Sequence, residues 1–151
     1  MRYYESLERR LGNVKKSFHS FFQKNNDFTR GKVIRIRDAN PDAKLVRGFC
    51  EGRENDRKDR MAMGIMFHGT HRDSIQSICN DGICEMSHFT NSFHYAVRRS
   101  QGKQNYQGDA QVLAMAVLVE EEDRLGWKDA KLRSPCRDHA LPLFVLTIRN
   151  N

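Results

Sequence analysis

The run Gln111–Val119 constrains the fold more than any other stretch, because it is apolar along almost its whole length. Its residues are Gln-Val-Leu-Ala-Met-Ala-Val-Leu-Val, with one polar side chain at the start. A strand with one face in water alternates apolar and polar residues, whereas a continuous apolar run is typical of a strand buried on both faces. We therefore predict a central strand of a sheet at 111–119.

Other stretches have the patterns of strands and helices. Residues 32–37 alternate apolar and basic side chains, as a half-buried strand does. Apolar runs predict strands at 63–68 and 142–148, and a short strand is expected near 87–90. Helices are expected at 3–23, 42–50, 72–80 and 91–100, and Pro41 is placed to start the second of them. A chain of 151 residues suits a single domain, 1–151, of the α+β class.

The first expected helix carries a regular apolar stripe. The stripe residues follow spacings of three and four and are Tyr4, Leu7, Leu11, Val14, Phe18 and Phe21. This regularity predicts a seam that faces the core. Arg9, Arg10, Lys15 and Lys16 fall mostly on the other side, so a basic helix lying on a membrane surface is the alternative.

The tripeptide His68-Gly69-Thr70 directly follows an apolar strand and precedes an expected helix. Glycine at a strand end lets a ligand lie close to bare backbone, and His68 and Thr70 add two hydrogen-bonding side chains. We expect Thr70 or Asp73 to cap the helix and Gly82 to end it. The pattern suits a flat, polar, sugar-bearing ligand. The structural alternative is a strand end with a core histidine.

Composition narrows the classes of partner. The net charge of +7 and the pI of about 9.5 favour acidic partners such as phosphates or nucleic acid.

The four cysteines, Cys50, Cys79, Cys84 and Cys136, have no zinc-binding spacing, so we expect reduced thiols and no metal site. The acids at 120–123 are interpreted as a solvated strand end. No membrane-spanning run or secretion signal is visible, so we expect an intracellular monomer, cytoplasmic or nuclear, with no membrane partner.

The order of these motifs resembles a known family. The segments "KVIRIRDANPDAKLVRGF" and "IMFHGTHRDSIQSICNDGI" follow the first helix. They are similar to the first half of the catalytic domain of poly(ADP-ribose) polymerases, the diphtheria-toxin-like ADP-ribosyltransferases, and most of all to the mono-ADP-ribosylating branch. The resemblance implies NAD as the cosubstrate. It also implies two small antiparallel sheets, the split-sheet form, around an NAD cleft. His68 would hydrogen-bond a ribose, and the Gly69 backbone would hold the nicotinamide carboxamide.

A second block extends the resemblance. Residues 85–96 are similar to the family segment that stacks on nicotinamide, with His88 at the place of its tyrosine and Phe89 at the following phenylalanine. The resemblance adds Tyr95 and Ser100 to the NAD-binding residues, Ser100 as the hydroxyl for the carboxamide if the helix shifts by one turn. His88 is also a candidate acid or base near neutral pH. We therefore take His68 and His88 as the catalytic candidates.

The closing strand at 142–148, preceded by His139, resembles the last strand of the same family. Counting back eight residues from His139 places Lys131 where polymerising members have a glutamate. Without an acid there, synthesis of poly(ADP-ribose) is not expected. Residues 132–136 do not have the pattern of a strand.

Three functions remain open from the sequence. The favoured one is a mono-ADP-ribosyltransferase, a glycosyltransferase that moves ADP-ribose from NAD to a protein or nucleic-acid acceptor. The second is a catalytically inactive relative that acts as an RNA- or protein-binding module. The third is another transferase of the RNA 2′-phosphotransferase type. Arg98 or Arg99 filling the cleft would favour the binding module.

Overall fold

A computed structural model of the protein describes residues 6–24, 27–28, 31–51, 61–83, 88–90, 96, 110–119, 131–133 and 137–150. Helices and strands are mixed along the chain, and each strand pair is antiparallel, which confirms the α+β class. The elements are α1 (Leu7–Lys24), β1 (Asp27–Phe28), β2 (Gly31–Asp38), α2 (Ala43–Glu51), β3 (Ala62–Gly69), the 3-10 turn η1 (Arg72–Ser74), α4 (Ile75–Asp81), β4 (His88–Thr90), β5 (Ala110–Val119), β6 (Lys131–Arg133), the 3-10 turn η3 (Arg137–His139) and β7 (Ala140–Asn150).

The predicted strands at 32–37, 63–68, 111–119 and 142–148 and the predicted helix at 42–50 are all confirmed, with small shifts at their ends. The helix predicted at 3–23 is described from Leu7 onward. The short strand near 87–90 is β4. The helix predicted at 91–100 lies outside the described residues except for Ala96, which is helical and buried.

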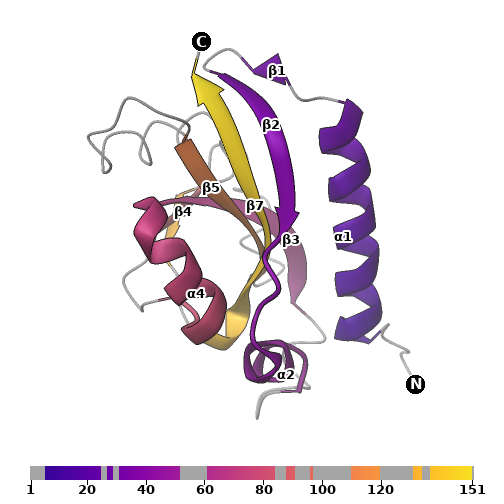
Figure 1. The fold of residues 1–151 in the computed structure, drawn as a ribbon. Coiled ribbons are helices and arrows are strands. Elements are labelled where there is room, and N and C mark those ends of the chain that lie inside the picture. Colours follow the sequence, from indigo (N-terminus) through magenta and orange to yellow (C-terminus); the bar gives the residue numbers. More distant parts are fainter. Residues whose placement is uncertain are drawn as a thin grey trace.

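The seven strands lie in the order β1-β2-β7-β5-β3-β4-β6 (Figure 1). β5 pairs along its length with β7 on one side and β3 on the other, so it is the central strand that its apolar run predicts. Each side chain from Val112 to Leu118 is 1% exposed or less, on both faces of the sheet. Continuous burial of this kind explains why the run has no alternation.

The expected two separate sheets are not found, because hydrogen bonds join all the described strands into one sheet. The junction between β3 and β4 is nevertheless narrow. β3 pairs with β5 through eight residues, but in the described residues it pairs with β4 only through Phe67 and Thr90. β4 itself is three residues long, and all three of them pair with β6 on its other side. Among the described residues, β4 and β6 are therefore joined to the rest of the sheet through a single residue pair, next to His68.

α1 lies against one face of the sheet and α4 against the other (Figure 1). The α1 side is built from apolar residues such as Leu11 and Phe18, packed with Phe67 and Phe144. The ring of Phe18 stacks on Phe144 at 5.5 Å between centroids and lies tilted to Phe67 at 6.1 Å. The stripe of α1 is thus a seam facing the core, as predicted. Each such side chain contributes about 1.5–3 kcal/mol through burial.

The helix ends correct two predictions about capping and confirm a third. α2 begins at Ala43 and not at Pro41, because Asp42 accepts the Lys44 N–H at 2.8 Å as an N-cap. Neither Thr70 nor Asp73 caps α4, since the 3-10 turn η1 leads into it from Ser74. Gly82 does end α4, as predicted. It has a φ of 85°, and its N–H donates to the Ile78 carbonyl at 2.8 Å.

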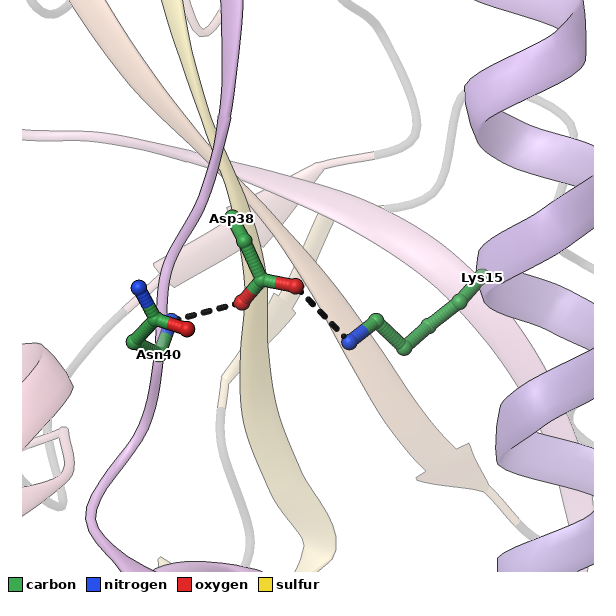
Figure 2. Close-up of polar contacts among 3 residues, drawn as sticks. All are labelled: Lys15, Asp38 and Asn40. Carbon is green, nitrogen blue, oxygen red and sulfur yellow. Dashed lines mark hydrogen bonds and ion pairs between the residues drawn. The ribbon is translucent and has the colours of Figure 1, made fainter.

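A polar contact fixes the end of β2 against α1 (Figure 2). The Asp38 carboxylate accepts a hydrogen bond from the Asn40 N–H at 2.7 Å and from Lys15 Nζ at 3.0 Å. The first of these holds Asn40 at a φ of 48°, a left-handed conformation that asparagine tolerates. Partial burial alone would raise the pKa of Asp38. The two hydrogen bonds and the charges of Lys15 and Arg37 outweigh that effect and hold this pKa below its ordinary value.

Candidate functional site

β3 delivers His68 and Gly69 at its end, opposite Leu113 and Val112 of β5. Side chains alternate between the faces of a strand, and Met66 packs with α4 while Phe67 packs with α1. His68 therefore lies on the face of the sheet that α4 covers. His68 and Thr70 are each 7% exposed. Both make polar or ring contacts within the protein, as a core histidine would.

β4 brings a second predicted residue to the same end of the sheet. Phe67 is paired with Thr90, and an antiparallel register counts up one strand as it counts down the other. The described residues of the two strands pair only at that position. Continued beyond it, the same register would bring Gly69 level with His88 and His68 level with Phe89. The structure thus sets β4 beside the end of β3, and the contacts predicted for His88 and Phe89 stay predictions. Their side chains lie outside the described residues.

β6 corrects the expectation that residues 132–136 contain no strand. Residues 131–133 form a short strand paired with β4, and Lys131 lies opposite Thr90. Thr90 in turn lies opposite Phe67, the residue before His68. Pairing with β4 supplies the hydrogen bonds that the local sequence does not predict. Lys131, found only by counting from His139, is therefore two strands away from the end of β3.

Several predicted residues lie outside the described residues. These are Tyr95, Ser100, Arg98, Arg99 and the acidic run 120–123. Of the elements expected around the cleft, the structure therefore describes the strands β3, β4 and β6. The grouping of His68, Gly69 and His88 around one ligand therefore stays a prediction.

A basic residue, Arg37, lies in the same row of the sheet as His68, three strands away. His68 lies opposite Leu113, Leu113 opposite Val145, and Val145 opposite Arg37, so these four residues form one row across the sheet. Arg37 is exposed and lies near Cys79 of α4. Burial raises the pKa of the Cys79 thiol, and the charge of Arg37 opposes that rise. The alternation of residues 32–37 was the signal that placed arginines on one face.

A groove of about 430 Å³ lies on the opposite face, between α1 and β3. It is lined by Asn13, Val14, Ser17, Phe18, Gly64 and Ile65. We call it the α1–β3 groove. Because His68 lies on the α4 face, this groove is separate from the predicted NAD site.

The described part of the chain holds no group of three or more His, Cys, Asp or Glu residues that could bind a metal ion. No described helix is both long and apolar enough to cross a membrane. No protein-family model matches the chain, and no curated protein sequence matches it either. The proposals below therefore depend on the residues and their arrangement.

Proposed function

We propose that the protein is an NAD-dependent mono-ADP-ribosyltransferase. The proposal depends on one observation above all: β3, β4 and β6 lie side by side where β3 ends at His68 and Gly69. The sequence resemblance assigns the nicotinamide and ribose contacts to residues of β3 and β4. The pairing of Phe67 with Thr90 supports this assignment, because it sets β4, which carries His88, beside the end of β3. Two independent lines of reasoning thus favour the same location.

The reaction breaks the bond between nicotinamide and ribose. Nicotinamide leaves with the electron pair of that bond, and the acceptor forms a new bond to the same ribose carbon while losing a proton. The transition state resembles an oxocarbenium ion, as in glycoside cleavage. A site accelerates such a reaction by holding ribose and nicotinamide in one orientation and by stabilising the leaving group.

The proposed roles follow from the chemistry of each group. His68 donates a hydrogen bond to a ribose hydroxyl, and the Gly69 backbone and the Thr70 hydroxyl hold the polar edge of the cosubstrate. His88 and Phe89 contact the nicotinamide ring, with Tyr95 and Ser100 completing its surroundings. An imidazole has a pKa near neutrality, so His88 is the residue we assign to accept the acceptor's proton.

Lys131 argues for transfer of one unit and against polymer synthesis. Extending a polymer requires a carboxylate that polarises a hydroxyl of the previous ribose. Lys131, opposite Thr90 on β6, has an ammonium group in place of that carboxylate and cannot polarise the hydroxyl in this way. Nucleic-acid or protein groups that are already good nucleophiles do not need this help.

The test is transfer of label from NAD carrying a labelled ADP-ribose moiety, with nicotinamide release measured in parallel. The wild type is compared with His68→Gln, which is close to histidine in size at a 7% exposed position but has no imidazole and presents its hydrogen-bonding atoms at other places. The matched control is His19→Gln, on α1 at the other face of the sheet. We expect loss of both signals in His68→Gln and retention in the control. Equal nicotinamide release by His68→Gln would contradict the assignment.

The alternative, an inactive binding module, has one observation in its favour. His68 is nearly buried and has contacts within the protein, as a residue kept for packing would. This reading predicts no NAD binding and normal folding. The two functions are thus separated by NAD titration of the folded wild type.

A further inference from the structure

Five polar residues lie on the α4 face of the sheet, beyond the part that α4 covers. They belong to three neighbouring strands and are Arg35, Arg37, Gln111, Thr147 and Arg149, which we call the arginine strip. Gln111 lies opposite Thr147, and Thr147 lies opposite Arg35. Directly opposed residues point to the same face, and so do residues two apart on a strand. Val145 packs with α4, which places Thr147 and Arg149 on the same face as Arg37.

The arginines of the strip are exposed and evenly stepped. Arg35, Arg37 and Arg149 are each exposed, while Thr147 and Gln111 are partly buried between them. Arg149 is two residues beyond Thr147, and Arg37 is two residues beyond Arg35, so each step along the strands is about 6.8 Å. Within the described residues, no side-chain hydrogen bond or ion pair of Arg35 or Arg149 is found. Three cations spaced along one surface attract a partner with regularly repeated negative charge.

The chemistry of the strip suits phosphates joined by sugars. A guanidinium group binds phosphate through two parallel hydrogen bonds. Between the arginines, Gln111 Nε2 donates a long hydrogen bond of 3.5 Å to Thr147 Oγ1. A contact of that length is weak, so both groups can exchange it for a sugar hydroxyl or phosphate oxygen. The guanidinium planes also offer surfaces on which unpaired bases stack.

The surroundings of the strip favour a single strand over a duplex. Arg37 lies near Cys79 of α4, so α4 borders the strip at that end. Gln111 lies at the β5 edge of the strip. Because Val112 is paired with Gly69, continuing the register of β5 and β3 by one residue brings Gln111 level with Thr70. From Arg35 to that edge the strip crosses neighbouring strands spaced about 4.8 Å apart. Its width therefore suits a single nucleic-acid strand, of which two or three nucleotides would lie on the strip.

We infer that the arginine strip binds single-stranded nucleic acid through its phosphates. The binding does not require NAD, and in that respect it is independent of the proposed function. Where the proposed transfer also holds, the strip would lead an acceptor strand towards His68, and that extension alone depends on the proposed function.

The test measures binding of a fluorescently labelled single-stranded oligoribonucleotide of about 12 nucleotides over a range of salt concentrations, without NAD. The test variant is Arg35→Gln with Arg149→Gln. The matched control is Lys16→Gln with Arg47→Gln, which removes the same charge from exposed positions on α1 and α2. Thermal melts of both variants, with wild-type melting temperatures expected, verify that they fold.

We expect the test variant to bind more weakly and the slope of log K against log salt to fall by about 1.4, the value for two lost phosphate contacts on a single strand. The control should retain the wild-type slope. Equal weakening in both variants would overturn the proposal, because it would show attraction to overall charge only. Absence of binding at low salt would also overturn it, as would equally tight, equally Arg35- and Arg149-dependent binding of a polyglutamate peptide.

Discussion

Replacing Phe18 by alanine is the strongest test of how α1 packs on the sheet. Its side chain is 8% exposed and contacts the rings of both Phe144 and Phe67, so it joins α1 to two strands. Replacement of a core phenylalanine by alanine costs about 3–5 kcal/mol. The α1–β3 groove already adjoins Phe18, and part of the lost contact is therefore absent in the wild type. We expect Phe18→Ala to lower the free energy of unfolding by about 3 kcal/mol, near the lower limit of that range.

The measurement is urea unfolding followed by circular dichroism, with Ser17→Ala as the control on the exposed side of the same helix turn. A domain of this size has about 5–15 kcal/mol of stability, so the loss is large and corresponds to a fall of about 6–12 °C in Tm. The slope of unfolding free energy against urea should stay unchanged. A double-mutant cycle with Phe144→Leu should give a coupling of about 0.5–1.5 kcal/mol. A loss below about 1 kcal/mol in Phe18→Ala would refute the packing described here.

The remaining predictions concern single polar or backbone features. Asp38→Asn should destabilise the protein at pH 7 by less than about 1 kcal/mol, because the Asp38 and Lys15 side chains are 42% and 35% exposed and solvent screens their attraction. The folded pKa of Asp38 lies below its ordinary value, so its stabilising effect is present above about pH 3.9 and is lost as pH falls through the folded pKa. Denaturation of wild type and variant at several pH values checks this, and a difference that grows on acidification would oppose it. Gly82→Ala should cost about 1–3 kcal/mol in thermal unfolding, because a φ of 85° with a ψ of 178° is a conformation almost restricted to glycine. Asp42→Ala should cost about 1 kcal/mol by loss of the N-cap of α2, and a neutral effect would show that the Lys44 N–H bond contributes little.

The sequence predicted the principal elements because their patterns are strong and local. The apolar run 111–119 has one physical solution, a strand buried on both faces, and β5 is that strand. The stripe of α1 likewise has one side that avoids water. Ends of helices were less predictable, since Asp42 and the 3-10 turn at 72–74 depend on local geometry that several sequences share.

The short strand β6 could not be predicted from its own residues. Lys131, Leu132 and Arg133 have no strand pattern, and their conformation is set by pairing with β4, far away in the sequence. The same is true of the row that joins His68 to Arg37, because it depends on the register of four strands. Pairing between distant strands is what a single sequence specifies least directly. The patterns of residues 63–68 and 32–37 nevertheless predicted the strands that carry His68 and the arginines of β2.

The most direct test of the proposed site is NAD binding by isothermal titration calorimetry. Wild type, His68→Gln and the control His19→Gln are titrated under the same conditions, after circular dichroism shows that all three are folded. We predict binding to the wild type and to His19→Gln, and its loss in His68→Gln, because His68 and Gly69 form the end of β3 beside β4. No heat of binding to the folded wild type at millimolar NAD, or undiminished binding to His68→Gln, would contradict the account.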